Sequence, residues 1–260
     1  MILVTGATGF LGRFVVDELL SNGRSVRVLV RDAANRTLPW GEGVEVIDGD
    51  ILDVMALAQA MEGVEAVIHA AAMVSFQKKD RERVRQVNEE GTARVVDACL
   101  AAGVRRLVHV SSIGAVGRSP KGEAITEQTP WQPEQAQSTY AKSKRRAEME
   151  VYRGIAEGLD AVMVNPGLIL GPGDWTQGTP RIFATVAGGL RFRNHGTNGL
   201  VGAADVARAC HLLLDAEVPA GERYILVAAN QDYGQFLGSI AEALGKRPPR
   251  WVIPRPVAIA

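Results

Sequence analysis

The stretch TGATGFLG, residues 5–12, carries the strongest structural signal in this chain. It directly follows a short apolar run, Ile2–Thr5, and it opens a segment of helical periodicity, Leu11–Leu20. In such a strand-to-helix turn, Gly6 allows the tight bend, Gly9 lets the backbone approach a pyrophosphate, and Gly12 lets the helix lie close to the sheet. The helix N-terminus then offers free N–H groups to the phosphates. The stretch therefore predicts a dinucleotide-binding turn made of Gly6, Thr8, Gly9, Phe10, Leu11 and Gly12.

Short apolar runs rich in β-branched residues alternate with longer helical segments through the first part of the chain. Buried strands joined by helices indicate a parallel sheet covered on both faces, which is a doubly wound, Rossmann-like α/β fold. Gly63 and Gly103 follow two of the helices, where glycine suits a left-handed cap, and Asp53 is a candidate N-cap. The predicted strands are Ile2–Thr5, Val26–Val30, Val44–Ile47, Ala66–His69, Arg106–Val110 and Ala161–Val164, and the predicted helices are Leu11–Leu20, Val54–Met61, Arg81–Ala101 and Tyr140–Ala156.

The regular alternation ends after about residue 165, where glycine and proline become dense in NPGLILGPGDWTQGTP. We predict a Rossmann-like domain over residues 1–170 and a small C-terminal substrate-binding lobe over residues 171–260, interleaved with the last strands of the sheet. The final run, PPRWVIPRPVAIA, predicts no packed element and leaves open whether the natural chain continues beyond Ala260. Further expected elements are helices at Pro180–Val186, Asp205–Leu214 and Tyr233–Leu244 and a strand at Arg223–Val227.

Composition and charge narrow the possible partners. Twenty-nine basic residues balance 29 acidic ones, so no net field points to nucleic acid or to an anionic membrane. Cys99 and Cys210 lie far apart in apolar segments, which indicates buried free thiols in a reducing cytoplasm rather than a disulfide or a metal site. The N-terminal MILVTGATGF lacks the basic leader of a signal peptide, and no apolar run is long enough to span a membrane. We therefore expect a cytoplasmic protein that acts on a small molecule.

The ends of the next strands carry the other candidate cofactor contacts. Arg31 ends the second strand, where an arginine suits the 2′-phosphate of NADP and an acidic residue suits the free ribose of NAD. Arg36, nearby on the following loop, also favours a 2′-phosphate, whereas Asp32 would favour NAD. We therefore prefer NADP as the cofactor and keep NAD as the alternative. Asp50 is a candidate acceptor for the adenine amine, and Ile51 is a candidate cover for the ring. Small residues after the fourth strand leave room for a cofactor backbone; these are Ala70, Ala71 and Ala72.

A tyrosine–lysine pair in STYAKSKRRAEME, residues 138–150, is the candidate for chemistry. Tyr140 and Lys144 are one helical turn apart, so their side chains share a helix face. The pair alone is a weak motif, because a packed tyrosine followed by a solvated lysine is an ordinary helix pattern. The RRAE run of residues 145–148 is interpreted as a solvated helix face.

Seven motifs, taken in order, resemble those of the extended short-chain dehydrogenase/reductase family. They are TGATGFLG, DGDILD, HAAA, VNEEGT, VSSIGAVG, YAKSK and VNPGLILGPGD. Within that family the chain looks most like the NAD(P)-dependent epimerase/dehydratase group and its dihydroflavonol-reductase-like branch. The likeness is tight over about residues 1–175 and loose beyond.

The resemblance implies that Ser112, Tyr140 and Lys144 are catalytic. A free tyrosine has a pKa of about 10, and the nearby Lys144 ammonium is expected to lower that pKa while also holding the nicotinamide ribose. Ser112 would orient the substrate oxygen, and Tyr140 would transfer the proton as hydride moves.

Other positions take roles by the same resemblance. Ser111 is expected to bond the backbone at its strand end, and Asn88 to have a structural role toward the neighbouring strand rather than to relay protons. Pro166 and Gly167 would place backbone beside the nicotinamide carboxamide. The family also leads us to expect a homodimer through the helices near residues 81–101 and 140–156.

Three functions remain open at this point. We favour an NADP(H)-dependent oxidoreductase acting on a carbonyl or secondary alcohol by a Ser-Tyr-Lys mechanism. The alternatives are a nucleotide-sugar epimerase with tightly bound NAD(P) and a non-catalytic cofactor-binding protein, which typically lacks the tyrosine–lysine pair. The acidic pair of the family's dehydratases is missing around Ile113, while Arg181, Arg191 and Arg193 stay candidates for gripping a diphosphate. His69 and His109 are expected to be satisfied core residues.

Overall fold

Seven parallel strands form the main sheet, in the order β10-β6-β5-β4-β1-β2-β3. The structure, a computed structural model, describes residues 1–119, 123–132, 137–176 and 178–253. The chain builds outward from β1 to β3 and then returns to the other side of β1 with β4, which is the switch of a doubly wound fold. The predicted fold class is confirmed. The strands are β1 (Ile2–Thr5), β2 (Val26–Val30), β3 (Val44–Asp48), β4 (Ala66–His69), β5 (Arg106–Val110), β6 (Ala161–Pro166) and β10 (Arg223–Leu226).

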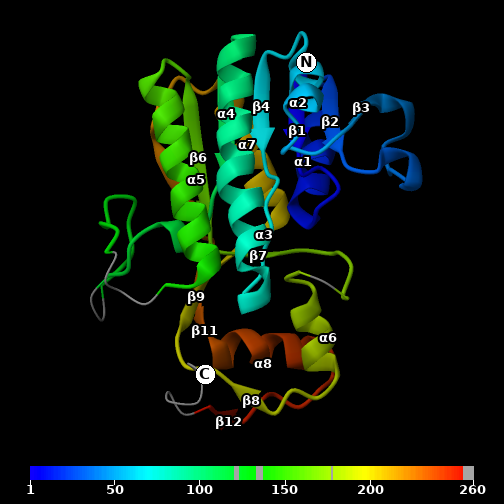
Figure 1. Ribbon diagram of the computed structural model, residues 1–260. Helices are drawn as coiled ribbons and strands as arrows, with labels where there is room; N and C mark the ends of the chain where they lie inside the picture. Colours follow the sequence, from blue (N-terminus) through cyan, green and yellow to red (C-terminus); the bar gives the residue numbers. More distant parts are fainter. Residues whose placement is uncertain (120–122, 133–136, 177, 254–260) are drawn as a thin grey trace. The chain divides into compact units, whose positions relative to one another are not determined.

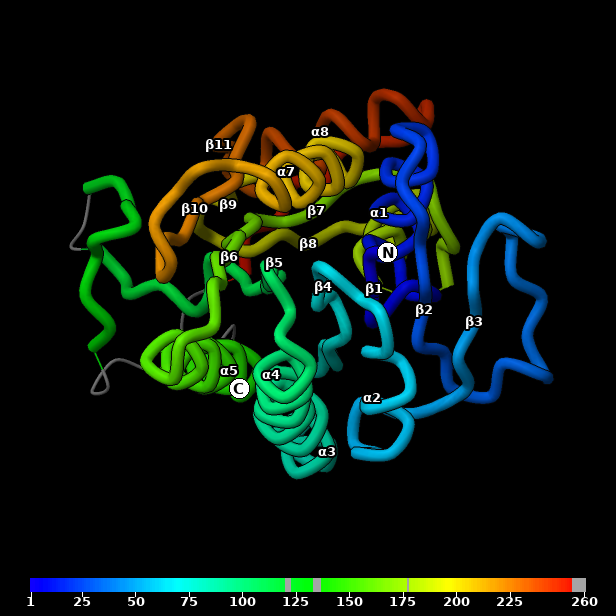
Figure 2. Tube along the Cα trace, turned by 90° about the horizontal axis from the view of Figure 1, so that it is seen from above, coloured from blue at the N-terminus to red at the C-terminus, as the bar shows by residue number. Residues whose placement is uncertain are grey.

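Helices cover both faces of this sheet (Figure 1). Figure 2 shows α1 and α7 along one face and α2, α4 and α5 along the other. On the second face, apolar side chains of the strands pack against the helices, and Leu3, Leu107 and Val151 are fully buried there. The helices are α1 (Phe10–Ser21), α2 (Val54–Met61), α3 (Arg81–Arg85), α4 (Gly91–Ala102), α5 (Thr139–Ala156) and α7 (Ala203–Asp215), with short turns η1 (Ala33–Asn35), η2 (Gly41–Gly43), η3 (Lys78–Asp80) and η5 (Ile113–Ala115).

Local sequence signals set several of these boundaries. The Asp53 carboxylate accepts hydrogen bonds from the backbone N–H groups of Met55 and Ala56, at 2.9 and 3.2 Å, and so caps α2 as predicted. Gly63 and Gly103 follow α2 and α4 with φ of +67° and +65°, which is the left-handed conformation expected after a helix. Cys99 and Cys210 are buried free thiols, and burial raises the pKa of each to about 12.

The helix predicted over Arg81–Ala101 is interrupted, which corrects the sequence interpretation. A π-helical turn, η4 (Gln86–Glu90), separates α3 from α4. The Thr92 hydroxyl donates to the backbone carbonyl of Asn88 at 2.6 Å, so a side chain takes part in the hydrogen bonding of the helix backbone at this turn. Hydrophobic periodicity does not reveal one inserted residue, because both flanking segments keep a helical pattern.

The chain forms two compact units, and the second has its own core. Met1–Pro166 and Ala204–Leu226 make the first unit; Gly167–Ala203 and the described part of Val227–Ala260 make the second. The division therefore lies slightly before the predicted boundary at residue 170. The second unit holds β7 (Leu168–Leu170), α6 (Arg181–Ala187), β8 (Phe192–Arg193), β9 (Thr197–Gly202), β11 (Ala229–Asp232), α8 (Tyr233–Ala243) and β12 (Trp251–Val252).

Two small sheets of the second unit were missed by the sequence patterns. One joins β11, β9 and β7, and the other joins β12 to β8. Trp251–Val252 thus pairs with Phe192–Arg193, although the sequence predicted no packed element there. β8 and β12 have two residues each and β7 has three, while β9 and β11 carry several polar residues or glycines, so these strands lack the longer apolar runs that mark the first unit. Within the described residues, no helix has both the length and the apolar character needed to cross a bilayer.

Candidate active site

The glycine turn after β1 is shaped by close backbone contacts. Gly6 has φ of +76°, and a Cβ there would lie 2.6 Å from the main chain of Ala71. A Cβ on Gly12 would lie 2.1 Å from the carbonyl oxygen of Gly6. Both positions therefore require glycine for the fold itself. Gly9 differs, since its Cβ would meet nothing closer than the Gly6 carbonyl oxygen at 3.1 Å.

The N-terminus of α1 suits a phosphate group. Its N-cap residue is the exposed Gly9, no side chain caps it, and its first turn carries no acidic residue. Thr8, Phe10 and Leu11 around it are partly exposed. Uncapped N–H groups and the positive end of the helix favour an anion at this point. The predicted residues of the turn thus fit a dinucleotide pyrophosphate.

Charged side chains meet at the ends of β2 and β3. Arg31 lies 3.6 Å from the carboxylate of Asp50, and Arg83 of α3 lies 3.8 Å from the same carboxylate. The Arg31 side chain is 62% exposed and is free to turn toward a ligand. Arg36 is turned back, because its Nε donates to the backbone carbonyl of Arg31 at 2.8 Å. Asp32 is exposed and has φ of +58°.

Two other predicted cofactor positions serve the packing of the fold. Ile51 is 7% exposed, and its side chain fills the space beside Gly91, where a Cβ would lie 2.5 Å from Ile51 Cδ1. Ile51 therefore has little surface left to cover an adenine ring. After β4, Ala70 and Ala71 are partly exposed and Ala72 is exposed. The main chain of Gly6 passes close to Ala70 and Ala71, which favours small residues in this segment. The contact of these alanines with a cofactor remains a prediction.

The three predicted catalytic residues come from two adjacent segments of the first unit. Ser112 is the second residue after β5 and caps η5, where its Oγ accepts from the backbone N–H of Gly114 at 3.1 Å. Tyr140 lies in the first turn of α5, which Ser138 caps through a 3.1 Å bond from the N–H of Ala141. Burial raises the pKa of the Tyr140 phenol, and interaction with the Ser112 hydroxyl acts in the opposite direction.

Lys144 is buried, which changes the role expected of it. Its side chain is 2% exposed, and Nζ donates to the backbone carbonyl of Val110 at 2.7 Å. Burial lowers the pKa of Lys144 to about 8, and the charge of Glu148 acts against that shift. The expected lowering of the Tyr140 pKa by this ammonium is not what the structure shows, because burial dominates at Tyr140. Lys144 Nζ bonds the end of β5, and its expected contact with the nicotinamide ribose stays a prediction.

Asn88 has the structural role expected of it. Within the π-turn, its side-chain oxygen accepts from the Met73 N–H at 2.7 Å, and its amide donates to the Met73 carbonyl at 3.0 Å. The same amide donates to Ser143 Oγ at 2.9 Å, and Ser143 Oγ donates to the Tyr140 carbonyl at 2.8 Å. Asn88 therefore joins the loop after β4 to the turn that carries Tyr140.

His69 and His109 were both expected to be satisfied core residues, and the structure confirms this for His69 but not for His109. His69 is satisfied, with Nδ1 2.7 Å from Thr5 Oγ1 and Nε2 3.0 Å from Thr92 Oγ1. His109 lies beside it, with ring centroids 5.3 Å apart, but both of its ring nitrogens are buried without a hydrogen-bond partner among the described residues. Burial, followed by the charge of Lys144, lowers the pKa of both histidines, that of His69 to about 3. Both rings are neutral at neutral pH.

A buried carboxylate beside these residues was missed by the sequence. Glu148, in the run interpreted as a solvated face, is 0% exposed. Ser111 bonds the backbone at its strand end, as expected, through its N–H to the Val164 carbonyl at 2.8 Å, and it also donates its hydroxyl to Glu148 Oε1 at 2.6 Å. Asn165 of β6 donates to the same oxygen at 2.6 Å. The spacing of four residues after Lys144 is the signal that places Glu148 on the buried face.

β6 ends at Pro166, the last residue of the first segment of the first unit. Pro166 is buried and pairs with Leu226 of β10. Gly167 comes next, and a Cβ there would lie 2.3 Å from the carbonyl oxygen of Gly199. Close strand approach thus explains the glycine, and the contact of both residues with a nicotinamide stays a prediction.

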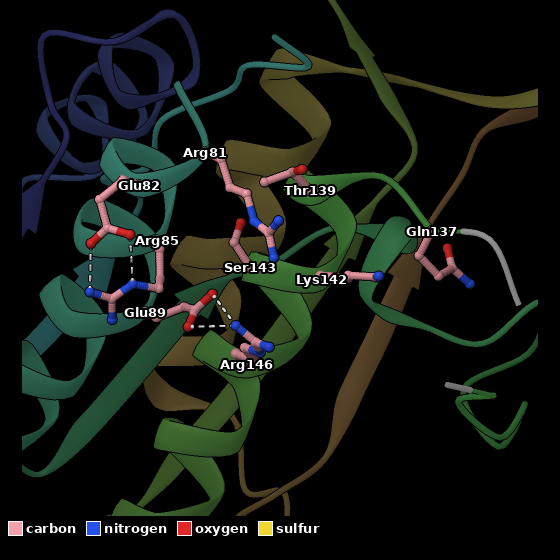
Figure 3. Close-up of a pocket in the computed structure, with 9 residues that line it drawn as sticks. All are labelled: Arg81, Glu82, Arg85, Glu89, Gln137, Thr139, Lys142, Ser143 and Arg146. Carbon is pink, nitrogen blue, oxygen red and sulfur yellow. Dashed lines mark hydrogen bonds and ion pairs between the residues drawn. The ribbon is translucent and has the colours of Figure 1, made fainter. Parts of the chain in front are cut away.

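A cavity of about 350 Å³ opens between α3 and the start of α5 (Figure 3). Figure 3 shows two charge pairs in its wall, Arg85–Glu82 at 2.7 Å and Arg146–Glu89 at 3.3 Å. None of the three predicted catalytic residues lines it. Its lining residues are Arg81, Glu82, Arg85, Glu89, Gln137, Thr139, Lys142, Ser143 and Arg146.

Comparison with known proteins assigns the family. The model of the NAD-dependent epimerase/dehydratase family matches residues 2–226, which is most of the chain. The chain belongs to this family. It is therefore an NAD(P)-dependent enzyme of the extended short-chain dehydrogenase/reductase type, as the motifs predicted.

Relatives of this epimerase/dehydratase family member include reductases and epimerases. It is 36% identical over 254 residues to sterol demethylase protein B of Methylococcus capsulatus, covering 97% of this chain and 77% of that protein. It is 32% identical to a putative dihydroflavonol 4-reductase of Synechocystis, over 96% of this chain and 74% of that protein. The solved UDP-glucose 4-epimerase of Thermus thermophilus, in complex with NAD, is 30% identical with a TM-score of 0.81, covering 97% of this chain and 85% of that one.

The glycine turn gives a prediction that separates binding from folding. We expect Gly9→Val to lower the thermal stability only slightly, because its Cβ would lie near a single protein atom, the Gly6 carbonyl oxygen at 3.1 Å. The added side chain would stand at the uncapped start of α1, so we expect NADPH binding to weaken at least tenfold. Gly12→Val, by contrast, should lower the melting temperature, since its Cβ would clash at 2.1 Å. NADPH fluorescence titration and thermal unfolding measure the two effects. Undiminished affinity in Gly9→Val would show that the turn does not bind the pyrophosphate.

Proposed function

We propose that the protein is an NADPH-dependent reductase of an apolar carbonyl compound, acting through Ser112, Tyr140 and Lys144. The observation that carries this proposal is the position of Tyr140 in the first turn of α5, beside Ser112 and one turn before the buried Lys144. A phenol, a hydroxyl and an ammonium at one place suit proton transfer to a substrate oxygen that gains negative charge.

The hydrogen bonds of this group favour reduction. The cofactor supplies the hydride when bound. Gly114 N–H donates to Ser112 Oγ, so the serine hydroxyl can use its own proton as a donor, either to the Tyr140 oxygen or to a substrate carbonyl. The raised pKa of Tyr140 keeps the phenol protonated at neutral pH, as a general acid requires. The positive charge of Lys144, held at the end of β5, favours the phenolate that remains after the proton leaves.

The surface around Tyr140 favours an apolar substrate. The Phe76 ring lies edge-on to the Tyr140 ring at 6.0 Å between centroids, yet the residue is 71% exposed. Val74 in the same loop is 63% exposed. Aromatic and aliphatic side chains at this place offer contact area to an apolar molecule but no hydrogen bonds to a sugar ring.

A nucleotide-sugar epimerase remains the second candidate, since the UDP-glucose 4-epimerase of Thermus thermophilus shares the fold and 30% of the sequence. The arginines considered for a diphosphate lie in the second unit, where Arg193 is 4.0 Å from Asp232. The exposed Phe76 beside Tyr140 argues for the reductase.

Tyr140→Phe tests the catalytic assignment. With a substrate identified by screening ketones and nucleotide sugars for NADPH absorbance changes, we expect turnover to fall by at least about a hundredfold, because the variant lacks the proton donor. NADPH affinity should stay close to that of the wild type. Tyr152→Phe, on the same helix and partly buried, is the matched control and should stay active. Activity of Tyr140→Phe within about threefold of the wild type would refute the role.

Phe76→Ala tests the substrate class. We expect KM for an apolar ketone to rise about tenfold, with a smaller change in kcat, because an apolar contact is lost in both the ground state and the transition state. Met55→Ala, which removes another highly exposed apolar side chain on α2, should leave KM unchanged. If the screen instead yields activity only on nucleotide sugars, or if KM is unaltered in Phe76→Ala, the apolar assignment is wrong.

Arg31→Ala tests the preference for NADPH. A 2′-phosphate brings about two negative charges to the end of β2, and the exposed guanidinium of Arg31 is suited to pair with it. We expect the wild type to bind NADPH at least tenfold more tightly than NADH, and the variant to lose most of that difference. Arg208→Ala on α7 removes an exposed arginine elsewhere and is the control. Equal affinities in the wild type would contradict the preference.

A further inference from the structure

Glu148 of α5 is enclosed by groups that donate hydrogen bonds or carry positive charge. Its Oε1 accepts from Ser111 Oγ and from Asn165 Nδ2, each at 2.6 Å. Its Oε2 accepts from an Arg145 guanidinium nitrogen at 3.2 Å and lies 3.7 Å from Arg223 of β10. A carboxyl group that only accepts, at 0% exposure, matches the ionised form. A negative charge is therefore built into the interior of the first unit.

This carboxylate is linked to the segment that carries Ser112. Asn165 is 0% exposed, and its side-chain amide donates both to Glu148 and, at 2.9 Å, to the backbone carbonyl of Ser112. Ser111, the preceding residue, bonds Glu148 directly. Glu148 thus adds a link between α5 and the chain after β5, beside the bond from Lys144 Nζ to the Val110 carbonyl, and Ser112 lies in the linked segment.

The same carboxylate lies one helical turn from Lys144. Both side chains are buried, and the Lys144 ammonium bonds only a neutral carbonyl among the described residues. Tyr140 on α5, His69 on β4 and His109 on β5 are the other titratable groups close to it, and the histidines are neutral. A buried cation needs an opposite charge nearby. Glu148 is the buried anion in reach, and it raises the pKa of Lys144 against the effect of burial.

We propose that Glu148 is a positioning residue of the active site: it is the counter-charge that keeps Lys144 a cation, and it holds the chain at Ser112 through Asn165. The inference rests on the proposed function of Ser112, Tyr140 and Lys144. It assigns a role to a residue that touches neither substrate nor cofactor.

A purely structural ion pair would have a different signature. Arg145 and Arg223 provide positive charge around Glu148, and Tyr152 on α5 is also near it. If Glu148 served only to pair with these arginines, losing either partner of the pair would loosen the structure in the same way. If Glu148 acts as the counter-charge of Lys144, loss of Glu148 must lower the pKa of Lys144, whereas loss of Arg145 must not lower it.

The direct test is NMR titration of Lys144 in the full-length protein. The chain has six lysines, so a sample with ¹³C-labelled lysine side chains gives few signals, and Lys144→Arg assigns the one of interest. We expect Glu148→Gln to lower the pKa of Lys144 by about one unit or more, because the attraction that favours the ammonium is lost. Arg145→Gln, the matched control, should leave that pKa unchanged or raise it.

Each result is decisive for the inference. An unchanged Lys144 pKa in Glu148→Gln, or a fall in both variants, overturns it. If Glu148→Gln does not fold, Arg145→Gln alone still tests the inference. Removing the Arg145 charge can only weaken its repulsion of the Lys144 ammonium, so a lower pKa of Lys144 in this variant would overturn the inference. These titrations need no substrate, so they test the role of Glu148 separately from the proposed function. Glu148 can prove not to be the counter-charge although Tyr140→Phe is inactive. Conversely, the proposed reductase function can prove wrong although the pKa of Lys144 changes as expected.

Kinetics on the confirmed substrate provide the second readout. The ammonium is lost as pH rises through the pKa of Lys144, so wild-type kcat should fall above about pH 8. In Glu148→Gln that fall should begin about one pH unit lower, with a lower kcat and little change in KM for the substrate. A uniform loss of activity at every pH would indicate a structural role only.

Discussion

The hydrogen bond from Lys144 Nζ to the Val110 carbonyl places a charged group inside the protein, and much of the surrounding structure follows from it. An ammonium at 2% exposure is costly unless hydrogen bonds and an opposite charge accompany it. The ends of β4, β5 and β6 and the facing sides of α4 and α5 accordingly carry polar side chains where an apolar core would be expected. Thr92, Ser143, Glu148 and Asn165 all belong to this polar layer.

Some of these polar groups fix helices and others prepare the chemistry. Asn88 donates to Ser143, and Ser143 donates to the backbone carbonyl of Tyr140, so neutral hydrogen bonds on the buried side hold the first turn of α5. Ser111 and Asn165 hold the end of β5 through Glu148. On the surface side, the exposed Phe76 ring lies edge-on to the Tyr140 ring. Positioning comes from the buried side of the site, and the surface loop is left free to contact a substrate.

The sequence predicted the first unit well because its signals are local. Apolar runs identified the strands, TGATGFLG identified the cofactor turn, and Asp53 identified a helix start. The failures depended on contacts between distant segments. The side chain of Glu148 looks solvated in RRAE, and only the packing of α5 on β5 and β6 shows that it is buried. His109 looked like an ordinary core residue, yet its ring nitrogens find no partner in the described structure. The strands of the second unit are short and pair across long separations in the sequence, so local patterns do not identify them.

The π-turn at Gln86–Glu90 has a consequence for how this enzyme can change over evolution. A π-turn is equivalent to one extra residue inserted in an α-helix, and each residue turns a helix by about 100°. Deleting a residue here would give a regular helix, but α3 would rotate by that angle relative to α4. Asn88 would then no longer face both Met73 and Ser143. The number of residues in this segment is therefore more tightly constrained than the identity of most of its side chains. Selection should remove single-residue deletions here but tolerate many substitutions.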